Sequence, residues 1–522
     1  MLGHLGARLE RLELPPDLAI AWVAMGAVLL VGTALFLFLL GAAELCSSNE
    51  AAEGLAVQRM VEHGELLAPA LNGHAPMFKP PLFHWTAAGI ARALGVHEAT
   101  ELTVRLPSVV FALVCTLLVM IFVRSFLGLS NALLAGGVLL ASYQYTSAAR
   151  FGRVDMALTC CEFLALSAFA SWAARMDAAP ERRPRHADAA LYVFAVGLGL
   201  GVLAKGPVGM VLPLATALAV LVTTRRWASL RALASPGPAL LVLIVSSAWY
   251  VACLWTRRLD VLERQLVYEN FSRFVGGIGT MSPFYYLKPL LLNSAPLSLV
   301  VPFAVVRALR SGPRRESAEG GGVRDVRPFA LAVFWIVTVV FFSVAAYKRR
   351  AYLLPLWPPA AVLLVWWLST WRGERERHVA KAALALLCGA LIVFNAAYVP
   401  HAERAACGGA DYRAAAAAIN SVVPRDAALY LGDDAGIESA SLLFYLDRTA
   451  PLLKSALADA PTGYVLVPER AWTARPPSTK LFPLLEVALE RRRLILVETA
   501  DLRHAHGDRR GAMTLTNEKR AP

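Results

Sequence analysis

Long apolar runs recur along most of this chain, and they constrain its fold more than any other feature. A helix needs about 20 mostly apolar residues to cross the hydrocarbon core of a bilayer. Charged residues make up 17% of the chain, against about 25% in a typical soluble protein, so a soluble fold would have too little polar surface. We expect about eleven membrane-spanning helices, near residues 18–41, 105–124, 131–148, 155–175, 188–204, 207–223, 238–256, 286–308, 328–346, 352–370 and 379–400.

This pattern predicts an all-α, multi-pass membrane protein with a small α/β domain outside the membrane. Residues 1–400 form the expected membrane domain. Two of its outer loops, 42–104 and 257–285, are long enough to contain secondary structure of their own. Residues 401–522 form the expected soluble domain.

The C-terminal segment alternates between two kinds of local pattern. We expect helices over 412–422 and 481–493, and short strands over 428–431 and 464–467. The residues from about Asp501 onward are polar, and we expect them to fray.

Arginine-rich loops alternate with arginine-poor loops along the chain, and this alternation predicts how the helices are oriented in the membrane. Loops rich in arginine, such as the one with Arg225, Arg226 and Arg231, are typical of the cytoplasmic side. The N-terminus is therefore expected in the cytoplasm and, with an odd number of spans, the C-terminal domain outside. Topology accounts for much of the net charge of +13. No basic–aromatic motif accompanies it, so we expect no nucleic-acid partner.

Seven cysteines are too few for a disulfide framework, and their spacing does not resemble a metal site. Five of them lie inside apolar runs, where cysteine behaves as a small apolar residue. Cys46 and Cys407 lie just outside expected spans, and the sequence leaves open whether they form a disulfide.

The first outer loop carries candidate chemical residues on two expected helices. Ser48 and Asn49 can cap a helix over 50–62, on which Glu50 and Glu53 share one face. The alternative role for these carboxylates is to complement the helix dipole.

A second helix of the first outer loop is expected over 77–94, with prolines in its first turn. Lys79 therefore lies beside the positive end of a helix, where a phosphate can bind. The alternative is an exposed loop lysine without a ligand.

Several charges enter apolar segments near the outer surface, where they are unfavourable unless paired or functional. Asp155 follows Arg150 and Arg153 at the mouth of the fourth expected span, and a structural pair between Arg153 and Asp155 is the alternative to a functional acid. Lys205 interrupts two short apolar runs in the same way.

A basic cluster outside the membrane breaks the positive-inside pattern. It contains Lys348, Arg349 and Arg350, followed by Tyr352, and such a cluster indicates a bound anion. Together with the carboxylates, these cations suit a phosphate-bearing lipid whose head group is attacked at the outer boundary. Cations stabilise a departing phosphate, and a carboxylate can accept the proton of an attacking hydroxyl.

The order of motifs resembles the family 39 and related glycosyltransferases, a membrane-embedded group that includes the aminoarabinose transferases of lipid A and the protein O-mannosyltransferases. The resemblance is carried by Asn49-Glu50, Met60, Leu71-Asn72-Gly73, Lys79-Pro80-Pro81-Leu82, Trp85, Arg105-Leu106-Pro107-Ser108, Arg153-Val154-Asp155-Met156, Lys205-Gly206-Pro207-Val208-Gly209 and Tyr352-Leu353-Leu354-Pro355.

The resemblance implies a GT-C fold in the bacterial plasma membrane, with its active site outside. It implies inverting transfer of a sugar from a polyprenyl-phosphate donor to a lipid, glycan or protein acceptor. The implied catalytic acids are Asp155, Glu50 and Glu53. The residues expected to bind substrate are Asn49, Lys79, Arg150, Arg153, Lys205, Lys348, Arg349, Arg350 and Tyr352.

This chain also departs from the family. The family usually has an aspartate, the favoured base, where this chain has Asn49, and often an arginine where it has Ala52. Aminoarabinose transferases have an acidic zinc ligand where this chain has Phe78, and a histidine ligand that is missing near 280–283. We therefore expect no zinc site of that kind, although another divalent metal stays open. Lipid A aminoarabinose transfer is not expected as the specific reaction.

A non-catalytic protein that binds or transports lipid-linked sugars is the alternative function. Asn49 is the only residue that favours it. A transporter would be expected to show repeated halves, and the sequence contains no convincing internal repeat.

Overall fold

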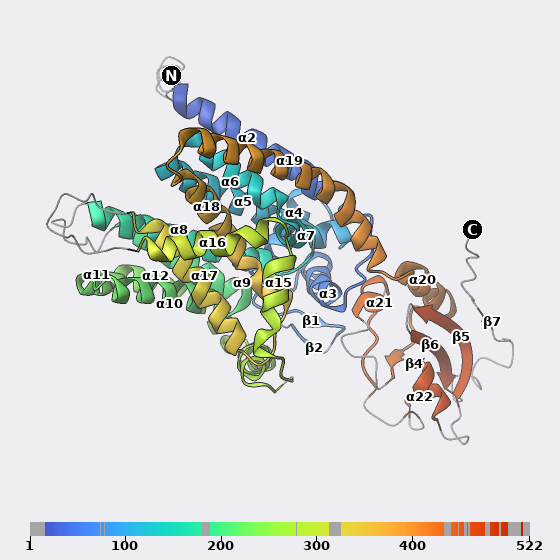
Figure 1. The fold of residues 1–522 in the computed structure, drawn as a ribbon. Helices are drawn as coiled ribbons and strands as arrows, with labels where there is room; N and C mark the ends of the chain where they lie inside the picture. The colour runs from blue at the N-terminus through green and yellow to red at the C-terminus, as the bar shows by residue number, and fades with distance from the viewer. Residues whose placement is uncertain are drawn as a thin grey trace, which may run out of the picture.

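The structure of this protein is a computed structural model, and helices make up most of it (Figure 1). It describes residues 16–73, 75–77, 79–178, 188–277, 279–312, 325–432, 440–446, 448–453, 457, 460–475, 481–489, 492–499 and 513–514.

Seven helices among the described residues are long and apolar enough to cross a membrane. The expected multi-pass helical protein is therefore confirmed, whereas the number of about eleven spans stays a prediction. These helices are α2 (Pro16–Leu37), α5 (Glu101–Leu127), α8 (Asp155–Ala178), α12 (Pro236–Trp255), α17 (Arg327–Val344), η4 (Arg350–Leu356) continued by α18 (Trp357–Ser369), and α19 (Glu374–Ala405).

Five further apolar helices lie where the other four spans were expected. The first two, α15 (Leu287–Leu292) and α16 (Leu297–Arg310), form a pair bent by 111°. The other three are the shorter helices α6 (Leu129–Ala141), α9 (Ala189–Lys205) and α10 (Val208–Thr223). The short helix α7 (Tyr143–Ala149) follows α6, and the short helix α11 (Trp227–Leu233) follows α10.

Small residues let α8, α9 and α10 approach closely, as is common between membrane helices. A Cβ atom on Gly197 of α9 would lie 2.7 Å from the backbone nitrogen of Ala165 in α8. A Cβ atom on Gly201 would lie 2.6 Å from the carbonyl oxygen of Gly209 in α10. This packing brings the first residue of α8, Asp155, beside the last residue of α9, Lys205.

The two long loops contain short elements. The first holds both expected helices, α3 and α4, although α4 begins at Leu82, later than predicted, with Pro81 as its N-cap residue. The elements are α3 (Ser48–His63), β1 (Ala70–Leu71), β2 (Ala75–Pro76) and α4 (Leu82–Ala93) in the first loop, and α13 (Leu259–Leu262), the π-helix η2 (Glu263–Ser272), α14 (Arg273–Val275) and η3 (Pro283–Tyr286) in the second.

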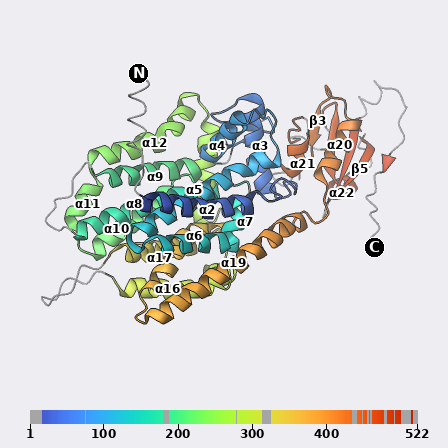
Figure 2. The ribbon, with the colours of Figure 1, turned by 90° about the horizontal axis from the view of Figure 1, so that it is seen from above.

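The chain beyond α19 forms a separate sheet with small helices, apart from the membrane helices in both views (Figures 1 and 2). The strands are ordered β3-β4-β6-β5-β7. The elements are α20 (Tyr412–Val422), β3 (Leu429–Leu431), α21 (Ala440–Tyr445), β4 (Tyr464–Pro468), α22 (Glu469–Thr473), β5 (Leu481–Leu489), β6 (Arg492–Thr499) and β7 (Met513–Thr514).

One prediction for the C-terminal segment is wrong. The expected helix over 481–493 is instead the hairpin formed by β5 and β6. Leu485, Val487 and Leu489 are buried in alternation with more exposed neighbours, which is the period of a strand. Strong helix formers such as Leu, Glu and Arg concealed this alternation. Apart from β7, the tail expected to fray from Asp501 lies outside the described residues.

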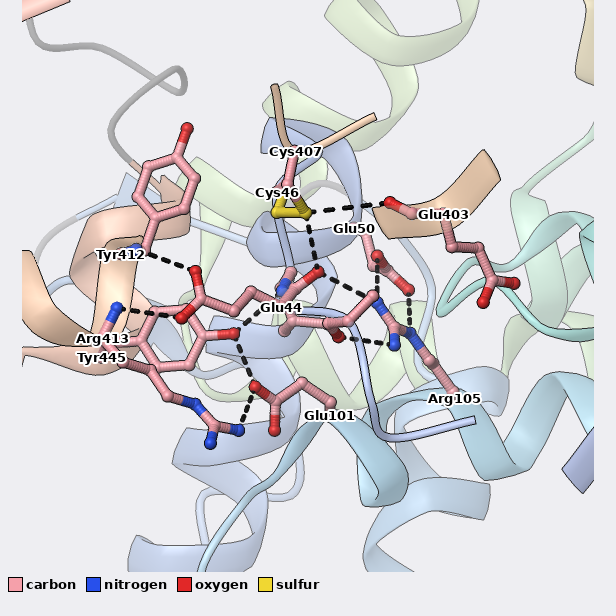
Figure 3. Close-up of a disulfide and its surroundings, with 12 residues drawn as sticks. Glu44, Cys46, Glu50, Glu101, Arg105, Glu403, Cys407, Tyr412, Arg413 and Tyr445 are labelled. Atoms are coloured by element: carbon pink, nitrogen blue, oxygen red, sulfur yellow. Dashed lines mark hydrogen bonds and ion pairs between the residues drawn. A yellow bond between two sulfur atoms is a disulfide. The ribbon is translucent and has the colours of Figure 1, made fainter. Parts of the chain in front are cut away.

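Cys46 and Cys407 form a disulfide, a pairing that the sequence alone had left undecided (Figure 3). It joins the segment between α2 and α3 to the chain just after α19. Beside it, the Glu44 carboxylate accepts hydrogen bonds from the backbone N–H groups of Tyr412, at 2.8 Å, and Arg413, at 3.1 Å. The start of α20 is thereby fixed to the first outer loop.

Candidate active site

Asp155 and Lys205 form a buried ion pair at the meeting point of α8 and α9. The Lys205 ammonium donates a hydrogen bond to Oδ1 of Asp155. Nη2 of Arg153 lies 3.2 Å from the other oxygen, Oδ2. The pair expected between Arg153 and Asp155 is therefore present, but Lys205, a residue 50 positions away in the chain, also neutralises the acid.

The segment that precedes Asp155 is held in place by α5 and α3. The Ser108 hydroxyl donates to the carbonyl oxygen of Phe151 at 2.6 Å. The Gly152 N–H donates to Oε1 of Glu50 at 2.8 Å. A Cβ atom at Gly152 would lie 2.6 Å from a side-chain carbon of Val104, so the close approach requires glycine.

Glu50 is fully engaged in a structural network (Figure 3). Arg105 donates to it from Nε at 2.8 Å and from Nη2 at 3.1 Å. The same guanidinium donates to the carbonyl oxygens of Leu40 and Ala43. Glu50 is 1% exposed. Bidentate pairing with a guanidinium fixes the orientation of the carboxylate, so Glu50 positions the loop.

Glu53 and His84 form a second buried pair, with 2.8 Å between Nε2 of His84 and Oε2 of Glu53. Both side chains are buried. The pair links α3 to α4 and lines neither of the two cavities described below.

Lys79 points to Glu269, an acid of the second outer loop that is a candidate from the sequence but is not among the predicted site residues. Oε2 of Glu269 accepts from the Lys79 ammonium, and Oε1 accepts from Arg273 at 3.0 Å. Burial would raise the pKa of Glu269, but the charges of Lys79 and Arg273 outweigh it and lower that pKa below its ordinary value. In the sequence, the spacing of four residues between Glu269 and Arg273 was the signal that these two side chains can form an ion pair.

A cavity of about 380 Å³ opens beside these charges; we call it the Lys79 cavity. One part of its wall carries Lys79, Lys205, Glu269 and Arg273. The Lys205 ammonium also lies 4.6 Å from the centre of the Tyr352 ring. The remaining wall is mainly apolar, with Val208, Val211, Phe271, Phe274, Phe341 and Phe342. Such a cavity can hold an anionic group that is attached to an apolar chain.

A second cavity of about 300 Å³, which we call the Arg350 cavity, is lined by Arg153, Asp155 and Arg350 together with polar side chains. Arg349, which lines neither cavity, donates to Oδ1 of Asn49 at 2.9 Å. Of the predicted site residues, Lys79, Lys205 and Tyr352 line the Lys79 cavity, and Arg153, Asp155 and Arg350 line the Arg350 cavity.

Four predicted substrate-binding residues line neither cavity: Asn49 and Arg349, which are hydrogen-bonded to each other, and Arg150 and Lys348. Arg150 makes a bidentate pair with Glu403 of α19, at 2.9 and 2.8 Å, and donates to carbonyl oxygens at the end of α2. Lys348 is buried and donates to the carbonyl oxygens of Met281 and Ala345. The structure gives Arg150 and Lys348 contacts that hold segments together.

The expected absence of a zinc site of the aminoarabinose-transferase kind stays a prediction. Within the described ranges, no group of three His, Cys, Asp or Glu side chains is close enough to hold a metal ion. Phe78, which replaces the acidic ligand, lies outside the described residues.

The pair between Lys79 and Glu269 predicts a pH-dependent contribution to stability. Because the pKa of Glu269 is lowered in the folded protein, the contribution is fully present above its ordinary value of 4.5 and is lost as the pH falls through the lower folded value. We expect the melting temperature of the wild type to exceed that of Glu269→Gln by a constant margin near neutral pH. The margin should shrink below about pH 4.5; a margin independent of pH would contradict the assignment.

Comparison with known proteins supports the resemblance at the levels of sequence and fold. Residues 78–252 match the family described as dolichyl-phosphate-mannose-protein mannosyltransferase. ArnT from Cupriavidus metallidurans bound to undecaprenyl phosphate superposes with a TM-score of 0.73 and 17% identity, covering 93% of this chain and 99% of that chain. The resemblance to family 39-type glycosyltransferases is confirmed. The fold is accordingly the GT-C fold of that group.

Two curated relatives show how far the sequence similarity extends. An uncharacterized protein of Aquifex aeolicus is 25% identical over 347 residues, which are 66% of this chain and 64% of the relative. An undecaprenyl phosphate-alpha-4-amino-4-deoxy-L-arabinose arabinosyl transferase of Pectobacterium carotovorum is 30% identical over 176 residues, which are 33% of this chain and 29% of the relative. The match thus spans less than two thirds of each relative's length.

Proposed function

We propose that this protein transfers a sugar from a polyprenyl-phosphate donor to an acceptor outside the cytoplasm. The observation that carries the proposal is the Lys79 cavity, in which Lys79, Lys205 and Arg273 lie at the edge of an apolar wall. Its charge and shape fit a phosphate on a long isoprenoid chain. The likeness in fold to an ArnT described as bound to undecaprenyl phosphate supports this donor class.

The mechanism we propose is direct displacement at the anomeric carbon. The donor phosphate takes the place of the Glu269 carboxylate beside Lys79. As the bond between the anomeric carbon and the phosphate oxygen breaks, negative charge grows on the phosphate and the three cations stabilise it. A carboxylate accepts the proton of the attacking hydroxyl, and attack from the opposite face inverts the anomeric configuration.

We further propose that α6, α9, α10 and the bent pair of α15 and α16 complete about eleven spans in the bacterial plasma membrane. In this arrangement the N-terminus is cytoplasmic, and the segment after α19 is a small α/β domain on the outer side. The disulfide between Cys46 and Cys407 supports this orientation, because disulfides persist in oxidising compartments. The acceptor is a lipid, glycan or protein, and catalysis needs no zinc of the aminoarabinose-transferase kind.

Charge removal at Lys79 tests the donor assignment. Lys79→Ala should lower transfer by about 10²–10³-fold, because one donor to the developing charge is lost. Transfer is measured in lipid nanodiscs from a radiolabelled polyprenyl-phosphate sugar to envelope membranes, and donor binding from the retention of labelled undecaprenyl phosphate. Lys288→Ala removes an exposed charge of the same kind and should keep wild-type values.

Two outcomes would contradict the proposal. If Lys79→Ala binds the donor and transfers sugar as well as Lys288→Ala does, the donor site does not lie in this cavity. A wild type that binds the donor without transfer, and gains transfer on Asn49→Asp, would identify a non-catalytic binding protein. The comparisons with known proteins do not favour that alternative.

A further inference from the structure

The Arg350 cavity lies on the other side of Asp155 from the Lys79 cavity. None of the residues that line one of these cavities lines the other. Lys205 lines the first and Asp155 lines the second, and their side chains are directly hydrogen-bonded. The boundary between the cavities is therefore this ion pair, so a group in either cavity can approach the same point.

The lining of the Arg350 cavity is rich in uncharged hydrogen-bonding groups. They are the hydroxyls of Tyr143 and Ser147 and the amides of Gln144 and Asn293. Gln144 is held in place, since its Nε2 donates to the carbonyl oxygen of Arg350 at 2.8 Å and its Oε1 accepts from the Trp357 indole at 3.1 Å. Several positioned hydroxyl and amide groups suit a ligand with many hydroxyls, such as a sugar head group.

The charge of the Arg350 cavity favours an anionic substituent on that ligand. Two guanidinium groups, Arg153 and Arg350, face one carboxylate, Asp155. Arg153 is paired with Asp155. Arg350 is exposed, and its guanidinium makes no ion pair within the part of the chain that the structure describes. A guanidinium in this state can bind phosphate or carboxylate.

Asp155 also offers the acceptor atom that the reaction needs. Its Oδ1 is held by Lys205, whereas its buried Oδ2 accepts no hydrogen bond from the described residues and has only the ion-pair contact with Arg153 at 3.2 Å. By contrast, Glu50 is bound by Arg105 and Gly152, and Glu53 is bound by His84. Of the three acids proposed from sequence, Asp155 alone lines a cavity with an oxygen that is not hydrogen-bonded.

We infer that the Arg350 cavity is the acceptor subsite, that it takes a hydroxyl-rich head group with an anionic substituent, and that Asp155 accepts the proton of the attacking hydroxyl. The inference rests on the proposed function. The hydroxyl oxygen forms the new bond to the anomeric carbon, and its proton moves to Oδ2 of Asp155. The bond from that carbon to the phosphate oxygen breaks, and its electron pair leaves with polyprenyl phosphate beside Lys79 and Lys205. Asp155 then returns the proton to water.

The test compares Arg350→Gln with Arg404→Gln, which removes an exposed arginine near the end of α19. The full chain is assayed in nanodiscs with labelled polyprenyl-phosphate sugar and graded amounts of envelope membranes. Arg350→Gln should raise the acceptor amount for half-maximal transfer at least tenfold, with maximal rate and undecaprenyl phosphate binding unchanged. Ser147→Trp, which fills the cavity, should abolish transfer while the donor still binds.

Matching results for Arg350→Gln and Arg404→Gln, or wild-type transfer by Ser147→Trp, would overturn the acceptor subsite. If the wild type or both arginine variants do not bind the donor, the proposed function is instead overturned.

Free sugars test the anionic substituent: glucose 6-phosphate or glucuronate should compete with the acceptor more strongly than glucose, and Arg350→Gln should abolish the difference. Stronger inhibition by glucose 6-phosphate identifies the substituent as phosphate, and stronger inhibition by glucuronate identifies it as carboxylate. Equal inhibition by all three sugars would overturn the inference that the ligand carries an anionic substituent.

Discussion

Replacing Asp155 with asparagine should lower sugar transfer by about 10²–10⁴-fold, which is the usual contribution of a positioned general base. The amide keeps the size of the side chain and an oxygen that can accept the Lys205 hydrogen bond. It cannot accept a proton from the substrate. Transfer is measured with saturating donor, and undecaprenyl phosphate binding is measured alongside, since binding should persist if the loss is in the chemical step.

Glu53→Gln provides the matched control for Asp155→Asn. It is the same change from acid to amide in a buried pair of the same region, but Glu53 lines neither cavity. We expect its transfer rate to follow the amount of folded protein. Equal losses in the two variants, or full transfer by Asp155→Asn, would contradict the assignment of Asp155 as base.

Arg105→Ala should produce the largest loss of stability. Removing one partner of a buried ion pair typically lowers the free energy of unfolding by about 3–5 kcal/mol, because the other charge remains buried without compensation. Here the stranded group is Glu50, which is 1% exposed. The change also removes hydrogen bonds to the carbonyl oxygens of Leu40 and Ala43. Denaturant and thermal unfolding in detergent measure the effect.

Arg124→Ala, in the same helix α5, is the control for Arg105→Ala. Arg124 is half-buried, and its removal should change stability by less than about 0.5 kcal/mol, as for most surface substitutions. The double variant Arg105→Met with Glu50→Gln should recover much of the loss, because no charge is left unpaired. Equal stability of Arg105→Ala and Arg124→Ala would show that this pair does not support the fold.

The sequence was sufficient for features that depend on local pattern. Apolar length predicted the membrane helices, and the glycine at position 64 indicated where α3 ends. The predicted capping by Ser48 and Asn49 is wrong, because α3 already begins at Ser48, and its N-cap residue, Ser47, makes no side-chain capping hydrogen bond. The strand β5 was missed because its helix-forming residues masked a period of two. A local pattern of this kind is decided by the partner strand, and β6 supplies it.

The candidate residues were selected from sequence, but their pairing was not. Asp155 meets Lys205 because α8 and α9 pack closely through small residues, and Lys79 meets Glu269 across 190 positions of the chain. Spacing along the chain cannot reveal such contacts. For the same reason, the sequence did not distinguish Arg153 and Arg350, which line a cavity, from Arg150, which clamps α19.

The bond between Cys46 and Cys407 also restricts how the chain is threaded through the bilayer. Both sulfur atoms must lie on one side, so the chain crosses an even number of times between them. Six of the seven long apolar helices lie between Cys46 and Cys407, and six crossings already make an even number. If the bent pair of α15 and α16 crosses once, an odd number of crossings must come from α6, α9 and α10.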